Sequence, residues 1–480
     1  FYMLFKDKLF KDFFSEDNST ELQCLISLAN DGYLSEYCFY TDSGHQKTSA
    51  FPHIYKRSAI LQWLKSNTKD PMTRNENVDI SYYPLLTFEE SVKNNEVLLL
   101  KQFIAKGLVD DINYKIFSLD RTALHVAAQK GHVDAINTLI ANKSSLEAKD
   151  NNGFTALHLA AVNGHVDAIN TLVGKGSNLE AKNKRGFTAL HLAAVNGHVD
   201  AINALIANKS SLEAKDNDGY TALHIAAAQQ GYVEAINALI EKGSSLEAQD
   251  NDGFTALHLA AYYGHVDAIN ALIGKGSSLE AKDNDGYTAL HIAAAQQGHV
   301  EAINALIEKG SSLEAKDKLG YTALHLAAFY GYVDAINALI ENGSNLEAKD
   351  HWGFTALHRA AAKGHVEAIN TLIANKSSLE AKDNDGYTAL HRAAANGHVE
   401  AINTLIANKS NLEAKDNNGY TALKWLARIG VVPALSIASR GKLGVPRPGS
   451  SASILREQGP RVEKSRKRKR SSDQQLDASF

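Results

Sequence analysis

The sequence predicts a mainly α-helical solenoid, a stack of repeated helical pairs joined by β-hairpin turns, and three observations support this fold class. The tetrapeptide Thr-Ala-Leu-His recurs with Thr at 122, 155, 188, 221, 255, 288, 322, 355 and 388, and Thr421-Ala422-Leu423-Lys424 is a tenth copy. The copies are 33 residues apart, or 34 after Thr221 and Thr288, and a fixed period in this range is typical of stacked supersecondary units. All prolines lie outside residues 85–432, as an uninterrupted helical array prefers.

One repeat, residues 150–182, shows how each element is specified. A tight turn is predicted at Gly153, and Thr155 is suited to the N-cap of a short first helix rich in Ala and Leu. Gly164 suits the left-handed position that ends this helix. Apolar residues within 166–173 then recur at helical spacing and predict a second helix. Neither helix can bury its apolar face alone, so the fold must be stabilised by contacts between neighbouring repeats.

This pattern resembles the ankyrin repeat, whose signature is Thr-Pro-Leu-His with Gly-His about seven residues later. Ala replaces Pro throughout, and both residue types suit the first helical turn. The resemblance covers about residues 86–435, with degenerate units at 85–113 and 421–441 as caps. Most histidines belong to Thr-Ala-Leu-His or Gly-His-Val and are explained as framework, and the other three have no metal-ligand spacing. We therefore expect no metal, no cofactor and no catalytic residue.

Positions that differ between the near-identical repeats are the candidate partner-binding residues. In ankyrin proteins the turn tips and the exposed end of the first helix form the concave binding surface. Aromatic side chains and a leucine at these positions are expected to face solvent and to bind a protein, and two arginines after His extend the site. The candidates are Tyr262, Tyr263, Leu319, Phe329, Tyr330, His351, Trp352, Arg359 and Arg392. The alternative is drift between tandem duplications, with the aromatic rings packing against one another.

A non-repeating segment precedes the array. Ile54, Ile60, Leu61 and Leu64 are predicted to lie on one face of a helix, and a turn containing Pro71 follows. The plain interpretation is a small helical cap for the array.

The same segment resembles the U-box, the zinc-free relative of the RING domain in ubiquitin ligases. The resemblance rests on Tyr55-Lys56-Arg57, Ile60, Trp63-Leu64, Asp70-Pro71-Met72-Thr73-Arg74 and, upstream, Cys24-Leu25-Ile26-Ser27, in which Leu25 replaces the family's Pro. It implies a small α+β domain over residues 20–85 that docks a ubiquitin-conjugating enzyme. Ile26 and Pro71 would belong to the apolar docking patch, and Arg74 would face the enzyme–ubiquitin junction. Such a domain acts by positioning the charged enzyme and forms no covalent intermediate.

The C-terminal tail differs in composition from the rest of the chain. Residues 441–480 carry ten Lys/Arg and four Asp/Glu, a balance of +6, so residues 1–440 carry −4 − 6 = −10. The tail, residues 442–480, lacks a hydrophobic period and is predicted to be disordered. Its basic cluster predicts a nuclear signal read by an import receptor: Lys464, Arg466, Lys467, Arg468, Lys469 and Arg470. The acidic body argues against nucleic acid as a partner of the array.

Two functions from different classes remain open. In one, the chain is a U-box-type E3 ubiquitin ligase that selects a protein substrate through the ankyrin array. In the other, it is a non-enzymatic scaffold or adaptor, including a nuclear-targeted effector. Residues 1–19 have no assigned role.

The predicted location is a reducing compartment, the cytoplasm, the nucleus or both. Two cysteines in 480 residues are typical of such a compartment, and no apolar run reaches the roughly 18–20 residues that a membrane helix needs. A eukaryote fits this sequence, and so does an intracellular bacterium that exports proteins into a host cell.

Overall fold

The structure is a computed structural model that describes residues 37–40, 53–56, 84–105, 109, 111–115, 118–297 and 299–429. Three predicted docking residues, Ile26, Pro71 and Arg74, lie outside the described residues, as does the basic segment 464–470. In the part of the chain that is described, no helix combines the length and the apolarity needed to cross a lipid bilayer.

The chain divides into two compact units, and the division falls inside the repeat array. Unit 1 comprises residues 1–160 and 167–178, and unit 2 comprises residues 161–166 and 179–480.

Unit 1 contains a small antiparallel sheet ahead of the first helices. Strand β1 (Tyr37–Tyr40) pairs with β2 (His53–Lys56), and Ile54 stands opposite Phe39. The prediction that Ile54 lies on a helical face is therefore wrong, because its backbone takes part in strand pairing. The other three residues of that predicted face lie outside the described residues.

The helices of unit 1 begin with the predicted degenerate repeat. Helices α5 (Pro84–Lys93) and α6 (Val97–Ala105) pack against each other and against α7 (Ala123–Gln129) and α8 (Val133–Ala141), respectively. A short 3-10 helix, η4 (Ser118–Asp120), precedes α7. Helices α9 (Ala156–Val162) and α10 (Val166–Gly174) form the repeat at the division between the units. Phe88 and Phe103 are buried in edge-to-face contact, so the degenerate unit caps the array with an aromatic core.

Unit 2 continues the array with seven complete helical pairs and one further first helix among its described residues. The first helices are α11 (Ala189–Val195), α13 (Ala222–Ala227), α15 (Ala256–Tyr263), α17 (Ala289–Ala294), α19 (Ala323–Tyr330), α21 (Ala356–Lys363), α23 (Ala389–Asn396) and α25 (Ala422–Ile429). The second helices are α12 (Val199–Ala207), α14 (Val233–Glu241), α16 (Val266–Gly274), α18 (Val300–Glu308), α20 (Val333–Glu341), α22 (Val366–Ala374) and α24 (Val399–Ala407).

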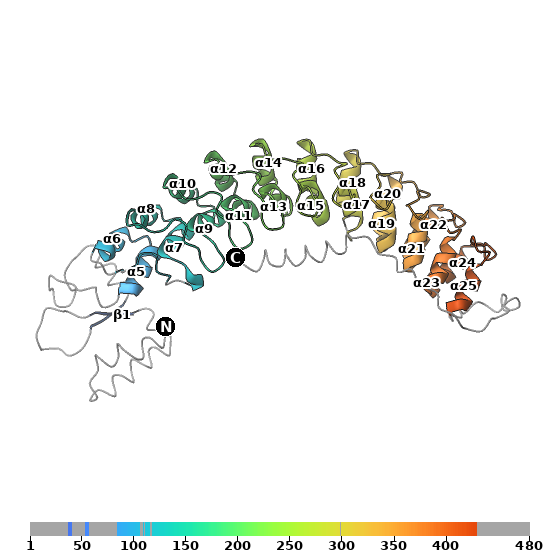
Figure 1. Cartoon of the computed structure of the whole chain (residues 1–480), viewed down its shortest axis with the longest axis horizontal. Coiled ribbons are helices and arrows are strands. Elements are labelled where there is room, and N and C mark those ends of the chain that lie inside the picture. Colours follow the sequence, from blue (N-terminus) through green and yellow to red (C-terminus); the bar gives the residue numbers. More distant parts are fainter. Residues whose placement is uncertain are drawn as a thin grey trace, which may run out of the picture. The chain divides into compact units, whose positions relative to one another are not determined.

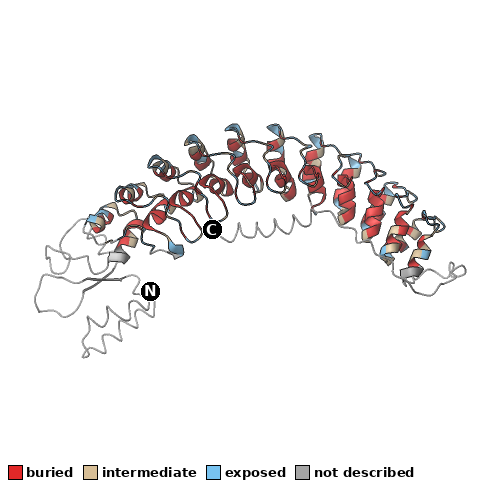
Figure 2. Cartoon of the chain, in the orientation of Figure 1, coloured by how far each residue is buried: buried red, intermediate tan, exposed pale blue. Residues whose placement is uncertain are grey.

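Within unit 2 the helices form two layers (Figure 1). Each first helix packs on the first helix of the next repeat, and each second helix packs on the next second helix. Figure 2 shows that the first helices are buried over most of their length, whereas the second helices expose one side. The small residues of Ala-Leu-His-x-Ala-Ala explain this arrangement, because short side chains let neighbouring helices approach closely.

The turns between repeats are not β-hairpins. The described residues 84–429 contain no strand, and the bridge between Lys415 and Thr421 is an isolated pair. Hydrogen bonds between repeats replace a sheet: Ser312 N–H donates to Glu280 Oε1 at 2.8 Å, and Lys316 Nζ donates to the carbonyl of Lys349 at 2.7 Å. Side chains therefore supply much of the pairing that a sheet would take from its backbone.

The two 34-residue repeats have shorter first helices than the 33-residue repeats. Helices α13 and α17 end at Ala227 and Ala294, and the two glutamines of each repeat lie in the turn that follows. In the 33-residue repeats Gly164 and its equivalents end the first helix; Gly164 has a φ of +69°, as its predicted left-handed position requires.

Candidate functional site

The histidines of the Thr-Ala-Leu-His motif have a structural role. Their ring nitrogens form hydrogen bonds within and between repeats, so they are not candidates for catalysis or metal binding. In α19, Thr322 N–H donates to Nδ1 of His325 at 3.2 Å, so the ring proton is on Nε2, which donates to the carbonyl of Phe354 at 2.8 Å. Burial lowers the pKa of His325 to about 4, which keeps the ring neutral. The same geometry recurs in the other copies of the motif in unit 2, which explains why each repeat needs His at this position.

An aspartate closes the turn tips of unit 2, except in the repeat where Asn183 takes its place. Oδ1 of Asp317 accepts the N–H groups of Leu319 and Tyr321 at 2.8 and 2.7 Å, and Asp317 N–H donates to the carbonyl of Tyr321 at 3.0 Å. Asn183 makes the same pattern in its own repeat. These aspartates were not predicted as functional residues, although their regular recurrence before Asn-Gly or Asp-Gly was visible in the sequence.

The residues just before the turn glycine of each tip form one continuous row, here termed the tip row. Each tip is joined to the previous one by a backbone hydrogen bond: His351 N–H donates to the carbonyl of Leu319 at 3.1 Å, and Asn384 N–H donates to that of Trp352 at 3.0 Å. Through such bonds the row runs in the order Asp218, Asp252, Asp285, Leu319, Trp352 and Asp385. Three acidic residues are therefore followed by two apolar ones.

In the apolar part of the tip row Trp352 faces solvent, as predicted, whereas Leu319 packs against the hydrophobic cluster of neighbouring repeats. Trp352 is 44% exposed, the largest exposure of any Trp, Phe or Tyr in the described part of unit 2. His351 is exposed beside it, and Leu319 is half-buried. The Trp352 ring lies 6.1 Å from that of Tyr321, so one face is supported and the remainder is open.

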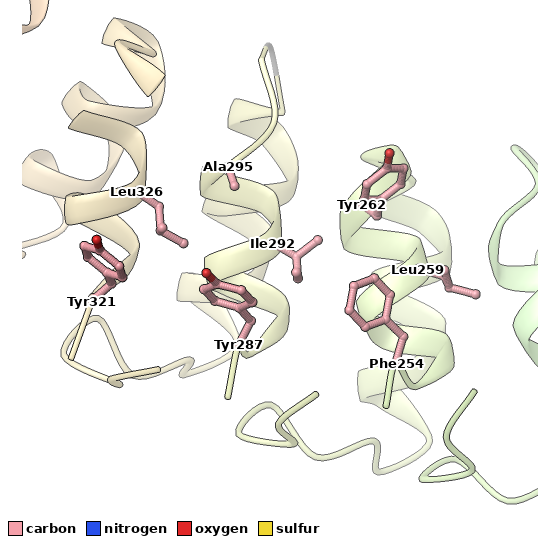
Figure 3. Packing of buried hydrophobic residues seen from close by; sticks show 8 residues of the cluster. All are labelled: Phe254, Leu259, Tyr262, Tyr287, Ile292, Ala295, Tyr321 and Leu326. Carbon is pink, nitrogen blue, oxygen red and sulfur yellow. The ribbon is translucent and has the colours of Figure 1, made fainter. Parts of the chain in front are cut away.

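Two aromatic residues at helix ends are buried, contrary to prediction. Tyr262 is 6% exposed and Phe329 is 7% exposed. Tyr262 joins a cluster that includes Ile292 and Ala295, where the small side chain of Ala295 leaves room for the ring (Figure 3). Each of these buried rings makes an edge-to-face contact with the aromatic residue after it. The alternative interpretation, mutual packing of the aromatic rings, therefore describes Tyr262 and Phe329.

The partners of these buried rings remain accessible. Tyr263 and Tyr330 are half-buried and pack against the same cluster. Tyr263 stacks on His265 with ring centroids 5.7 Å apart, and Tyr330 stacks on Tyr332 at 5.6 Å. Figure 3 also shows Phe254, Tyr287 and Tyr321 in a row before three consecutive first helices.

Arg359 is buried, so it does not extend the surface as predicted. Its exposure is 1%, and its guanidinium pairs with Asp350, with Nε 2.9 Å from Oδ2. It also lies over the rings of Tyr321, Trp352 and Phe354, at 4.6, 5.2 and 4.2 Å from their centroids. A buried charge is stable only when it is paired, as Arg359 is with Asp350. The paired guanidinium also lies against the Trp352 ring as a cation–π contact.

Arg392 is the partly exposed equivalent in the next repeat. Its Nε donates to Oδ2 of Asp383 at 2.7 Å, and Nη2 donates to Asp385 in the tip row at 3.1 Å. In the repeat after that, Trp425 Nε1 donates to Oδ2 of Asp416 at 3.0 Å. The residue nine positions after the tip aspartate therefore binds its second oxygen in the three C-terminal repeats.

In three repeats of unit 2 nearer the N-terminus, the residue nine positions after the tip aspartate is apolar and cannot bind this second oxygen. The residues nine positions after Asp216, Asp283 and Asp317 are Ile225, Ile292 and Leu326. Burial raises the pKa of each of these three aspartates to about 6. In unit 2 the tip carboxylates of Asp350, Asp383 and Asp416 therefore bind Arg or Trp, whereas burial is the largest influence on the pKa of Asp216, Asp283 and Asp317.

Comparison with known proteins agrees with the repeat architecture. A family model described as "Ankyrin repeats (3 copies)" matches residues 89–183, 175–250, 226–317, 257–350, 294–383 and 357–437. Among solved structures, the human ASB11 ankyrin repeat domain is 27% identical, with 47% of this chain and 99% of that chain covered and a TM-score of 0.42. A comparison with curated proteins found no match. The family matches extend over most of the sequence, and the chain belongs to the ankyrin-repeat family.

Proposed function

We propose that the array binds a protein partner through an aromatic surface centred on Trp352 and Leu319. Ankyrin repeats imply protein–protein interaction, and the observation that favours this surface is the exposed Trp352 ring beside Leu319 in a tip row whose other four members are acidic. Trp is enriched among residues that dominate interface energies, and a ring held by Arg359 and Tyr321 loses little conformational entropy on binding. The proposed surface also includes Tyr263, Tyr330, His351 and the accessible part of Arg392.

Capture of partners from cell extract by the full chain tests this proposal. The variant Trp352→Ala/Leu319→Ala should lose a partner that the wild type retains, with binding weakened at least about tenfold. Tyr114→Ala is the matched control, because Tyr114 is 60% exposed but lies in unit 1. Equal retention by all three proteins would contradict the proposal.

A finer proposal is that the chain is a U-box-type E3 ubiquitin ligase whose array selects the substrate. Asp70-Pro71-Met72-Thr73-Arg74 carries the resemblance, and the antiparallel pair β1–β2 just before it supports an α+β domain there. In this role Ile26 and Pro71 contact the conjugating enzyme and Arg74 faces its junction with ubiquitin. The competing function is a scaffold that binds the same partner without ubiquitin transfer.

An autoubiquitination assay distinguishes the ligase from the scaffold. The full chain is incubated with E1, ubiquitin, ATP and a panel of conjugating enzymes, beside Ile26→Ala/Pro71→Ala. The ligase predicts ubiquitin chains with the wild type and none with the variant, while both proteins capture the array's partner equally. A folded wild type that forms no chains with any enzyme is a scaffold.

The basic segment from Lys464 to Arg470 is proposed as a nuclear signal, which places the protein in the nucleus at least part of the time. Six cations within seven residues support this role. A fluorescent fusion should leave the nucleus when these six residues are changed to Gln. Unchanged nuclear accumulation would contradict the proposal.

A further inference from the structure

We propose that a segment of this chain's own C-terminal tail, residues 445–448 with the sequence Val-Pro-Arg-Pro, docks on the exposed tips that carry Leu319 and Trp352. These two tips are here termed the Trp352 surface, and residues 445–448 the tail segment. Docking there rests on the proposed function, because it gives the partner's surface a competing ligand within the same chain. The tail segment thereby regulates access of the partner.

The Trp352 surface belongs to the second copy of an internal duplication. Residues 221–287 and 288–354 each comprise a 34-residue repeat followed by a 33-residue repeat, and they differ at 13 of 67 positions. All four positions just before the turn glycines are among these 13. The corresponding pairs are Asn251-Asp252 with Lys318-Leu319, and Asn284-Asp285 with His351-Trp352. The second copy has therefore exchanged polar tips for apolar ones on a scaffold that is otherwise nearly unchanged.

The two copies hold their tips in the same backbone geometry. Oδ1 of Asp250 accepts the N–H groups of the residues two and four positions later at 2.9 and 2.8 Å, and Oδ1 of Asp317 does so at 2.8 and 2.7 Å. The difference between the copies therefore lies in the tip side chains. Trp352 is 44% exposed, so a ligand that covers its ring removes apolar surface from water, which is favourable.

Proline is a suitable ligand for such a ring. Aromatic surfaces bind proline-containing segments in the polyproline II conformation, because this conformation is preformed and loses little entropy on binding. Residues 442–480 contain three prolines, and two of them, Pro446 and Pro448, lie in the tail segment. The fixed φ of both prolines favours the extended conformation that such surfaces bind.

The spacing of the tail segment matches that of the tips. A polyproline II helix has three residues per turn and rises about 3.1 Å per residue, so Val445 and Pro448 share one edge and lie roughly 9 Å apart. Leu319 and Trp352 occupy neighbouring tips, and neighbouring helices pack at about 8–10 Å. One apolar side chain of the tail segment can therefore cover each of the two tips.

The tail is long enough to bring this segment back to the array. The described chain ends at Ile429 in α25, which packs on α23, and α23 packs on α21 next to the Trp352 tip. Two repeat spacings give roughly 16–20 Å, and the 8 residues of α25 add about 12 Å. The 15 residues from 430 to 444 can extend up to roughly 50 Å. Docking within one molecule is therefore geometrically allowed.

Charge is complementary beside the Trp352 surface. Asp385 follows Trp352 in the tip row, and its side chain is 68% exposed although Oδ2 pairs with Arg392. Residues 440–448 carry three cations and no acidic residue. Their attraction to Asp385 adds to apolar contact with the ring and should weaken as salt rises.

A labelled peptide tests the surface and its occupant together. The probe is a fluorescein-labelled peptide with the sequence of residues 441–451, and the host is the full chain with Val445→Ser/Pro446→Ser/Pro448→Ser. Fluorescence anisotropy should show saturable binding to this Ser host, with a Kd of about 0.1 mM or below. Wild-type chain should bind the peptide at least tenfold more weakly, because its tethered segment has an effective concentration on the order of 1 mM and occupies the site.

Two controls make the result specific. Leu319→Ala/Trp352→Ala in the Ser host should weaken peptide binding at least tenfold. Asp252→Ala/Asp285→Ala changes the equivalent tips of the first copy and should leave the affinity unchanged. A peptide that carries the same three Ser substitutions should not bind the Ser host, and this measurement leaves the array itself unaltered.

The outcomes separate tail docking from the proposed function. Absence of peptide binding, equal binding of the Ser peptide, or equal loss in the two double variants would overturn the tail segment as a ligand of the Trp352 surface. Equal affinity of wild type and Ser host would overturn docking within the chain and leave the surface to a proline-containing segment of another protein. Capture of a partner through Trp352 without peptide binding contradicts tail docking alone, whereas peptide binding without any captured partner contradicts the proposed function alone.

Discussion

At the scale of single residues, the buried histidines of this array act as connectors between repeats. His325 receives a backbone N–H from its own helix start and donates to Phe354 in the next repeat. His351 is exposed in a turn tip. The two histidines therefore make a matched pair for mutation.

We expect His325→Leu to lower the free energy of unfolding by about 2–4 kcal/mol, because two buried polar groups lose their partner. His351→Leu should change it by no more than about 0.5 kcal/mol. Urea unfolding followed by circular dichroism measures both. If both variants lowered the free energy of unfolding by similar amounts, the hydrogen bonds of His325 would not contribute to stability.

A double-mutant cycle tests how the buried pair of Arg359 and Asp350 contributes to the free energy of unfolding. Arg359→Leu alone leaves a buried carboxylate and should cost about 3–5 kcal/mol. Asp350→Asn/Arg359→Leu recreates the combination already present at Asn183 and Leu192, where Asn183 Oδ1 keeps both tip hydrogen bonds. We therefore expect the double variant to be more stable than Arg359→Leu, as measured by chemical denaturation. A double variant less stable than the single one would contradict this account.

At the scale of helices, glycine has two different roles. Gly364 ends α21 with a φ of +76°, and a Cβ placed there would lie 2.7 Å from Nδ1 of His398. Gly274 is the last residue of α16, and a Cβ there would meet no atom within 4 Å. Several other repeats carry Ala at the position of Gly274, for example Ala207.

Gly274→Ala should stabilise the protein by about 0.5–1 kcal/mol, because Ala reduces the entropy of the unfolded chain and favours a helix. Gly364→Ala should destabilise it by at least about 1 kcal/mol, since both its φ and its neighbour oppose a side chain. Thermal unfolding of the two variants should shift in opposite directions. Shifts of the same sign would show that the φ of Gly364 is not constrained.

At the scale of the whole molecule, stability depends on the sum of repeat interfaces, and buried ionisable groups make that sum dependent on pH. Burial lowers the pKa of His191, His291, His325 and His358 to about 4. In the unfolded chain these histidines bind a proton near pH 6.5, but in the folded chain they do so only near pH 4. The stability that the neutral histidines contribute is therefore fully present above pH 6.5 and is lost as the pH falls towards 4. Asp216, Asp283 and Asp317, with pKa values of about 6, act in the opposite direction.

We expect the melting temperature to fall between pH 7 and pH 5. The histidine contribution is the larger, because four more histidines have lowered pKa values: His125, His265, His365 and His391. Differential scanning calorimetry at the two pH values measures the change. A higher melting temperature at pH 5 would mean that the three aspartates outweigh the histidines.

The sequence by itself determined the repeat architecture. Period, turn glycines and the Thr-Ala-Leu-His signature are local, and each repeat meets the same neighbours, so one repeat predicts the others. The helix cap at Thr155 and the end at Gly164 followed from local backbone chemistry. Trp352 was predicted to be exposed from its place at a turn tip of an ankyrin-like repeat, and it is 44% exposed.

Only the tertiary structure decided which of the variable side chains reach solvent. Tyr262 and Phe329 each precede a half-buried tyrosine, yet both are buried, and Arg359 is buried against Asp350 and three aromatic rings. The tip aspartates are identical in sequence, yet Asp350 is paired while Asp317 is not, because the residue nine positions later differs. Packing and electrostatic pairing depend on atoms brought together from separate parts of the chain, and the repeat period alone does not specify them.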